Sequence, residues 1–155
     1  GAEKVHVIEV AARMHDIGKS GIPDSVLGKE GPLSPAEQET MRTHPRIGYD
    51  ILKGSPSKYL SMGSIIALGH HEKFDGTGYP NGLHGEDIPI VARIVAVADV
   101  FDALVSKRPY KHAWPIVEAI DFLKSQRGKH FDSKCVDAFL ADQAKIEAIY
   151  SDFAD

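Results

Sequence analysis

The sequence predicts an all-α domain, and three observations support this fold class. Apolar residues recur at helical spacing along most of the chain, residues that start or end helices flank these segments, and no segment shows a convincing strand alternation. The one short strand candidate, 88–94, contains Pro89 at a position typical of a helix start. With 155 residues, 43% of them hydrophobic, the chain is long enough to form one domain over residues 1–155 with a buried core.

The first helix is predicted over residues 4–15, where apolar residues share one face. Gly18 is placed to end this helix, so that His15 and Asp16 lie in its last turn. Residues 20–31 contain several glycine and proline residues, which interrupt regular structure. The sequence therefore predicts a loop between the first helix and the next.

A second helix is predicted to start at Ser34, which forms a capping-box pattern with Glu37. Pro45 restricts the residue before it, so this helix should end or kink at His44. The helical pattern then continues over 47–54 and again over 55–71.

The most apolar helix is predicted over residues 90–106, and its apolar residues cover most of its circumference. Asp99 and Asp102 are three residues apart and therefore share one face of this helix. A carboxylate inside a buried helix must be paired, protonated or bound to a cation. Arg93 could be the structural partner of these two acids. Two scaffold helices are predicted to follow, over 115–128 and 132–149.

The composition narrows the classes of function. There are 18 basic and 22 acidic residues, and the net charge of −4 does not suggest a protein that binds nucleic-acid polymers. The single cysteine, Cys135, excludes an intramolecular disulfide and fits a reducing compartment. The longest apolar run, 94–98, is too short to be a membrane segment, and no signal peptide is visible. We therefore expect a cytoplasmic protein, or the cytoplasmic part of a larger one.

Histidines and carboxylates at separate helix ends or faces form the candidate functional set. Its members are His15, Asp16, His44, His70, His71 and Asp99. Imidazole and carboxylate ligands without cysteine suit iron, manganese, zinc or nickel. Taken singly, His15 and His44 could equally be structural histidines with polar partners. If the set converges, a bridging carboxylate such as Asp16 could hold two ions, as phosphoesterases do.

The histidine pair is followed by a loop over residues 74–87, where glycines and Pro80 prevent regular structure. Arg108, Tyr110 and Lys111 come directly after the long helix. They could grip a phosphate, or they could be a basic helix end that complements the helix dipole.

Long ordered motifs occur at several separate places in the chain. The first are His15-Asp16-Ile17-Gly18-Lys19 and His44-Pro45, and the longest is His70-His71-Glu72-x-x-Asp75-Gly76-x-Gly78-Tyr79-Pro80. The others are Gly82-Leu83-x-Gly85-Glu86-x-Ile88-Pro89, Arg93-Ile94-Val95-Ala96-Val97-Ala98-Asp99, Asp102-Ala103-Leu104 and Arg108-Pro109-Tyr110. Together, over about residues 9 to 140, they resemble the HD-GYP family of the HD superfamily of metal-dependent phosphohydrolases.

The resemblance implies an HD-domain helical bundle with a GYP loop between core helices. It implies that the metal ligands are His15, Asp16, His44, His70, His71 and Asp99, with Asp16 as the bridging ligand. Lys19 would lie against the scissile phosphate and act with Asp16 in catalysis. The residues that would contact substrate or shape its binding loop are Tyr79, Pro80, Asp102, Arg108 and Lys111.

The activity that the resemblance implies is hydrolysis of cyclic di-GMP, or a related cyclic dinucleotide, to linear pGpG and in some members to GMP. The setting is bacterial second-messenger signalling, and the cofactors are two or three divalent metals, often iron or manganese. The family pattern includes a glutamate and a histidine on a helix upstream of His15. Neither Glu3 nor His6 fits that motif, so the resemblance leaves a third metal open.

The resemblance also implies partners, namely GGDEF-domain proteins and an upstream sensor or receiver domain; a homodimer is possible. Two other functions compete with the cyclic-dinucleotide phosphodiesterase. One is a regulatory HD-GYP module with weak catalysis that acts through partner binding, and the intact ligand set argues against it. The other is an HD-type hydrolase of mononucleotides, which the Tyr79 loop disfavours.

Overall fold

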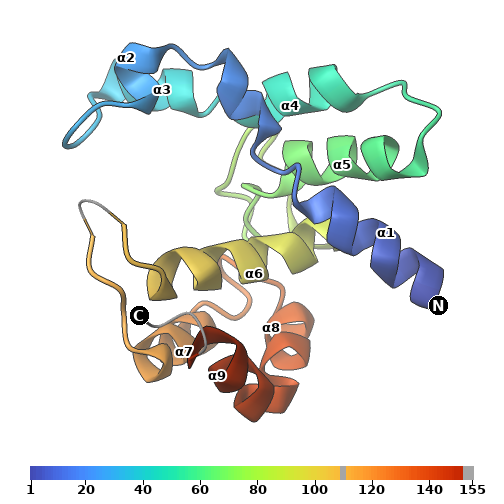
Figure 1. Cartoon of the computed structure of the whole chain (residues 1–155), viewed down its shortest axis with the longest axis vertical. Coiled ribbons are helices and arrows are strands. Elements are labelled where there is room, and N and C mark those ends of the chain that lie inside the picture. Colours follow the sequence, from blue (N-terminus) through green and yellow to red (C-terminus); the bar gives the residue numbers. More distant parts are fainter. Residues whose placement is uncertain (109–110, 152–155) are drawn as a thin grey trace.

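The computed structural model describes residues 1–108 and 111–151, and within them every regular element is a helix (Figure 1). In chain order the elements are α1 (Ala2–Ala12), η1 (Ile17–Gly21), α2 (Asp24–Leu27), α3 (Pro35–Met41), α4 (His44–Leu52), α5 (Lys58–Gly69), η2 (Gly85–Asp87), α6 (Ile90–Val105), α7 (Ile116–Ser125), α8 (Ser133–Phe139), η3 (Leu140–Asp142) and α9 (Gln143–Ser151). The predicted all-α class is confirmed. None of the described helices is both long and apolar enough to cross a bilayer.

The helices pack in two groups that share α6. On one side, α1 and α4 pack against α5, and α5 packs against α6; on the other, α7 and α8 pack against α6. Figure 1 shows α6 crossing the middle of the molecule between these groups. Each group has its own hydrophobic cluster, one including Ile66 and Val95 and one including Phe101 and Phe131. Because α6 contributes to both clusters, its position is well determined on both sides.

Burial of α6 is less complete than predicted. Val97 and Phe101 are fully buried, but Ile90 and Ile94 are 46% and 43% exposed, and Ala98 is exposed as well. These three exposed residues are four apart and form one stripe along the helix. The stripe is exposed because α5, α7 and α8 cover the other faces of α6.

The predicted helix start at Ser34 is confirmed. The N–H of Glu37 donates to Ser34 Oγ (3.2 Å), and the N–H of Ser34 donates to Glu37 Oε1 (2.9 Å), which together form a capping box. A break is found close to the predicted place, but α3 ends at Met41, three residues before His44, and His44 and Pro45 form the first turn of α4. This break places His44 at the N-terminal end of α4.

The predicted continuous helix over 132–149 is wrong, because η3 separates α8 from α9. The rings of Phe139 and Tyr150 both pack edge to face against Phe101, with centroids 5.3 and 5.2 Å away. Along a straight helix, residues eleven positions apart lie about 16 Å from each other. The turn at η3 therefore allows both rings to contact one buried phenylalanine.

Arg93 pairs with Asp132 of the α8 N-terminus, and the predicted partnership with the two acids of its own helix is wrong. Arg93 Nη1 lies 2.6 Å from Asp132 Oδ2, and the two side chains are 13% and 7% exposed. The other oxygen of Asp132 accepts a hydrogen bond from the N–H of Lys134 and so caps α8. The ion pair thus joins α6 to α8.

We expect Asp132→Ala to lower the free energy of unfolding by about 3–5 kcal/mol, because the buried Arg93 charge would lose its carboxylate partner and keep only its hydrogen bond to the Ile88 carbonyl oxygen. Burial raises the pKa of Asp132, but the Arg93 guanidinium and the hydrogen bond from the Lys134 N–H together outweigh burial and hold that pKa below its usual range. The stabilisation is therefore present above the unfolded value of about 3.9 and is lost as pH falls through the folded value. Urea unfolding of both proteins at a series of pH values should show a difference in stability that is constant from about pH 7 to about pH 5 and narrows as pH falls below the unfolded pKa; a difference that stays constant in acid would contradict this prediction.

Candidate metal centre

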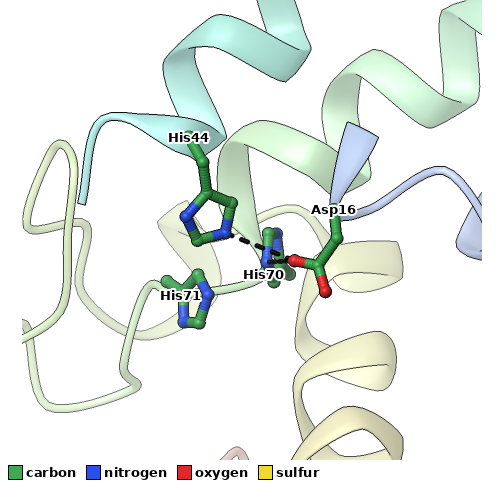
Figure 2. A group of neighbouring side chains, drawn as sticks. All are labelled: Asp16, His44, His70 and His71. Carbon is green, nitrogen blue, oxygen red and sulfur yellow. Dashed lines mark ion pairs between the residues drawn. The ribbon is translucent and has the colours of Figure 1, made fainter. Parts of the chain in front are cut away.

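Separate segments of the chain bring the six predicted ligands together. His15 and Asp16 lie in the turn between α1 and η1, His44 begins α4, His70 and His71 follow α5, and Asp99 lies in α6. Their ligand atoms form two groups, each with all atoms within 4.8 Å of one another. The first group is Asp16, His44, His70 and His71, and the second is His15, Asp16 and Asp99. Figure 2 shows the first group, with the Asp16 carboxylate directed at His44 and His70.

Asp16 belongs to both groups. Its Oδ1 atom lies 3.3 Å from His44 Nε2 and 3.4 Å from His70 Nε2, whereas its Oδ2 atom lies 3.1 Å from His15 Nε2. Asp99 approaches the same histidine from α6, with Oδ1 3.0 Å from His15 Nε2. A carboxylate with one oxygen directed at each group has the arrangement of a ligand that bridges two ions.

The orientation of three histidine rings is determined by the backbone. The Nδ1 atoms of His15, His44 and His70 lie 2.7, 2.8 and 2.9 Å from the carbonyl oxygens of Ala12, Met41 and Ala67. Because a carbonyl only accepts, each Nδ1 carries the hydrogen, and a neutral ring then has its lone pair on Nε2.

Those three Nε2 atoms test whether the residues fit a metal. All three are buried, and none makes a hydrogen bond within the described residues, although carboxylate oxygens lie 3.0–3.4 Å away. Buried lone pairs are normally satisfied. A divalent cation between imidazole nitrogens and carboxylate oxygens would satisfy them, and the Nδ1 bonds to the backbone are the usual support of histidine ligands. The residues therefore fit divalent metal ions.

The electrostatics of the cluster also suit cations. Burial raises the pKa of Asp16, but its interactions with His15 and the two neighbouring imidazoles outweigh burial and hold that pKa well below its usual range. Interaction with Asp16, and then with Asp99, raises the pKa of His15 to about 10, so a proton and a cation compete for its Nε2. Burial lowers the pKa of His71 to about 3, so this imidazole is neutral at neutral pH and can donate a lone pair.

Close packing of η1 against α4 allows Asp16 to reach His44. At Gly18, which is buried in this contact, a Cβ atom would lie 1.8 Å from the carbonyl oxygen of His44 and 2.6 Å from the nitrogen of Gly48. The prediction that Gly18 ends the first helix is wrong, since α1 already ends at Ala12. Gly18 is instead the point of contact between the segments that carry the two ligands.

Lys19 and Tyr79 lie next to the cluster. Lys19 Nζ is 3.3 Å from Asp16 Oδ2, and its side chain is 40% exposed. The ring of Tyr79 stacks on the ring of His71, with centroids 4.9 Å apart and planes 14° from parallel. Pro80 follows in the same loop and is exposed.

Asp102 lies one turn beyond Asp99 on α6 and accepts a hydrogen bond from the hydroxyl of Tyr150 (3.3 Å). With Asp99 and His15 it lines a groove of about 380 Å³ between α1, α6 and α9. The other residues that line this groove are mostly apolar. The second ligand group is therefore accessible from this groove.

Arg108 and Lys111 pair with each other through two main-chain hydrogen bonds of 3.1 Å. The ammonium group of Lys111 donates to the carbonyl oxygens of Ala103 and Leu104, at 3.0 and 3.1 Å, and so complements the C-terminal end of α6. No described contact joins either residue to the six ligands, and their contact with substrate stays a prediction. Tyr110, predicted alongside them, lies outside the described residues.

Two residues near the cluster had no role predicted from the sequence. Glu72 is buried, with 3% of the residue exposed, and holds part of the loop that follows the histidine pair. The feature of the sequence that could have indicated a role for Glu72 is its position directly after His71 in the longest motif. The guanidinium of Arg42 lies 5.1 Å from the centre of the Tyr79 ring. Arg42 is an exposed arginine near a helix end, and no feature of the sequence indicated its contact with Tyr79.

Glu3 and His6 lie apart from the cluster, in agreement with their lack of the upstream motif. Glu3 pairs with Lys58, and the His6 ring packs edge to face against Tyr59, with centroids 5.9 Å apart. Both partners belong to α5. Within the described part of the chain, neither residue belongs to a group of potential metal ligands.

Comparison with known proteins supports the assignment of this fold and these motifs to one family. Residues 1–135 match the family described as "HD domain". A solved structure, Bd1817, described as an HDG"Y"P protein from Bdellovibrio bacteriovorus, has a TM-score of 0.65 at 24% identity. That comparison covers 90% of this chain and 44% of Bd1817 and shows the common fold.

Curated relatives are more similar in sequence. The cyclic di-GMP phosphodiesterase response regulator RpfG of Xanthomonas campestris is 55% identical, and the alignment covers 98% of this chain and 40% of RpfG. A cyclic di-GMP phosphodiesterase of Thermotoga maritima is 49% identical, and the alignment covers 97% of this chain and 41% of that protein. A 3'3'-cGAMP-specific phosphodiesterase 2 of Vibrio cholerae is 44% identical over 96% of this chain and 28% of that protein. The chain thus spans less than half the length of these curated relatives. With the match over residues 1–135 and the His15-Asp16 and Gly78-Tyr79-Pro80 motifs, they establish that the chain belongs to the HD-domain family, in its HD-GYP branch.

Proposed function

We propose that this chain is the catalytic domain, over residues 1–155, of a metal-dependent phosphodiesterase. Its substrate would be cyclic di-GMP or a related cyclic dinucleotide, and its product the linear dinucleotide pGpG, with GMP if a second bond is hydrolysed. The observation that carries this proposal is the carboxylate of Asp16, which is shared by two groups of potential metal ligands. The curated relatives named for cyclic di-GMP and 3'3'-cGAMP support the substrate class.

In this proposal two divalent ions, iron or manganese in preference to zinc or nickel, would be held by the six ligands. A third ion would need further ligands, and neither Glu3 nor His6 belongs to a group of potential metal ligands within the described residues. When bound, such ions lower the pKa of a water molecule and neutralise charge on a phosphodiester. Asp16 would contribute one carboxylate oxygen to each group of ligands. The lone pairs on the buried Nε2 atoms of His15, His44 and His70 and on His71 complete the ligand set with Asp99.

The other predicted site residues would act on the substrate. The ammonium of Lys19 is close to Asp16 and partly exposed, so it can bind a phosphoryl oxygen beside the ions. Tyr79 and Pro80 would form one wall of the substrate site, and Asp102 would contact the substrate from the groove between α1, α6 and α9. Arg108 and Lys111 would contribute positive charge near the end of α6.

A substrate panel tests the proposed reaction. Purified protein loaded with Mn²⁺, or with Fe²⁺ without oxygen, would be incubated with cyclic di-GMP, 3'3'-cGAMP and mononucleotides, and products separated by chromatography. We expect linear dinucleotides from one or both cyclic substrates and no reaction of the mononucleotides. No linear product would contradict the proposal. If a chain with Asp16→Ala kept its effect in cells, the alternative of a regulatory module would be favoured.

Lys19→Ala should lower turnover of the cyclic dinucleotide by about 10²–10³-fold, which is typical for the loss of one group that stabilises charge in the transition state. Bound metal should change little, because Lys19 is not a ligand. Lys19→Arg should keep part of the activity, since it keeps the charge. Steady-state kinetics and elemental analysis of the three proteins would measure these effects. A Lys19→Ala protein that has lost its metal would contradict the assigned role.

The cellular setting is proposed on the same basis. We propose that the domain acts in the bacterial cytoplasm, where cyclic dinucleotides are signals, and that an upstream sensor or receiver domain controls it. GGDEF-domain proteins are the proposed protein partners, and a homodimer is a further proposal. Pull-down and light-scattering measurements with the full-length protein would test these interactions.

A further inference from the structure

His71 differs from the other three histidines of the cluster. The rings of His15, His44 and His70 each have Nδ1 bound to a backbone carbonyl oxygen. Neither ring nitrogen of His71 makes a hydrogen bond within the described residues. A ligand ring that lacks such a bond needs another constraint if it is to point steadily at an ion.

Tyr79 provides that constraint by stacking. Its ring lies nearly parallel to the His71 ring, 4.9 Å between centroids, and its backbone N–H donates to the carbonyl oxygen of His71 (3.2 Å). The loop can approach this closely because residue 78 is glycine. A Cβ atom at Gly78 would lie 2.4 Å from the nitrogen of Lys73 and 2.5 Å from the His71 carbonyl oxygen.

Glu72 holds the loop in this position. Its Oε1 atom accepts hydrogen bonds from the N–H groups of Asn81 and Gly82, at 2.7 and 3.0 Å, and its Oε2 atom accepts one from Leu83, at 2.8 Å. These three residues follow Tyr79-Pro80 directly, and Glu72 follows His71 directly. A single buried carboxylate, 3% exposed, therefore joins the ligand segment to the far side of the loop that carries Tyr79.

We infer that Glu72 is a positioning residue for one of the two ion groups. It keeps the loop folded back, the loop keeps Tyr79 stacked on His71, and the stack orients His71 toward the group of Asp16, His44 and His70. Within the described residues, no hydrogen bond joins Glu72 to the segments of the other group, which contains His15 and Asp99. This inference depends on the proposed two-metal site. It also assigns Tyr79 a contribution to metal binding through its ring, separate from any contact that its hydroxyl makes with substrate.

The experiment is a Mn²⁺ titration of the metal-free protein by calorimetry, with thermal unfolding of each variant as a measure of folding. In the wild type we expect two binding steps. Glu72→Ala should weaken one of them by about 10- to 100-fold, as is typical for loss of a residue that supports a ligand, and should weaken the other much less. Glu72→Gln should give a smaller loss, because its single oxygen can still accept from Asn81 and Gly82 while its amino group faces the N–H of Leu83.

Tyr79 variants separate the stack from the hydroxyl. Tyr79→Phe keeps an aromatic ring and should bind both ions as the wild type does, whereas Tyr79→Leu should weaken the same step as Glu72→Ala. Glu86→Gln is the matched control, since Glu86 is an exposed acid in η2 of the same loop, and it should bind Mn²⁺ unchanged. If Glu72→Ala does not fold, Glu72→Gln and Tyr79→Leu still carry the test.

The outcomes are distinguishable. A wild type that binds no Mn²⁺ would contradict the proposed metal site itself. A wild type with two steps, together with folded Glu72 and Tyr79→Leu variants that bind both ions with unchanged affinity, would overturn only the inference. Equal weakening of both steps in Glu72→Gln would also overturn it, because the effect would then not be specific to the His71 group.

Discussion

Replacing Asp16 with asparagine should reduce hydrolysis of the cyclic dinucleotide by at least about 10³-fold and should leave the protein with fewer bound ions. The expected rate loss corresponds to about 4 kcal/mol, within the several kcal/mol that a catalytic metal supplies. Asp16 directs one oxygen to each ligand group, at 3.1–3.4 Å from three Nε2 atoms. An asparagine has one oxygen and no charge, and its amino group would face a cation.

Elemental analysis and turnover measurements on the same preparation would test this prediction. Asp50→Asn is a matched control, because Asp50 is an exposed acid of α4 whose only described ion pair is with Lys53. It should keep the metal content and the rate of the wild type. An Asp16→Asn protein with two bound ions and a rate close to that of the wild type would show that Asp16 is not the shared ligand.

Gly18→Ala should lower the free energy of unfolding by about 3 kcal/mol, the upper part of the range for overpacking. The added Cβ would lie 1.8 Å from the carbonyl oxygen of His44 and 2.6 Å from the nitrogen of Gly48, so backbone must move. The movement would separate η1 from α4. Because Asp16 and His44 are carried by these segments, metal affinity should fall together with stability.

Urea unfolding of the metal-free protein measures the first effect, and Mn²⁺ titration measures the second. Gly21→Ala is the matched control in the same 3₁₀ helix, because the three atoms nearest to its Cβ would all belong to the side chain of Ile47, at 3.0, 3.2 and 3.8 Å. That side chain can adjust, and a change below about 1 kcal/mol is expected. Equal stability of the Gly18→Ala and wild-type proteins would contradict the close packing of η1 on α4.

The position of Asp99 explains why the two packing groups matter for the site. Asp99 reaches His15 from α6, which is held by hydrophobic residues on both sides of the molecule. The Arg93–Asp132 pair adds a polar link between α6 and α8, away from the cluster. A substitution that destabilises the packing of the C-terminal helices on α6 should therefore shift the position of Asp99, although it replaces none of the ligands.

Local sequence determined much of this protein. The helix starts at Ser34 and Pro89, the break before Pro45 and the all-α class follow from residue spacing, capping groups and backbone restrictions, which act over a few neighbouring residues. The candidate set of imidazoles and carboxylates was visible for the same reason, since their chemistry belongs to each residue. The role of Asp16 as a bridging ligand came from resemblance to a family, because spacing alone left that open.

Only the tertiary structure decided which groups meet. It determined that Gly18 contacts His44 and that Arg93 pairs with Asp132. It also determined that the chain turns between α8 and α9, so that one residue from each helix contacts Phe101. It also determined that Nδ1 of three histidines is bound to the backbone, which leaves Nε2 for a cation. These are contacts between segments far apart in sequence, and their energies depend on distances and burial that no local pattern specifies.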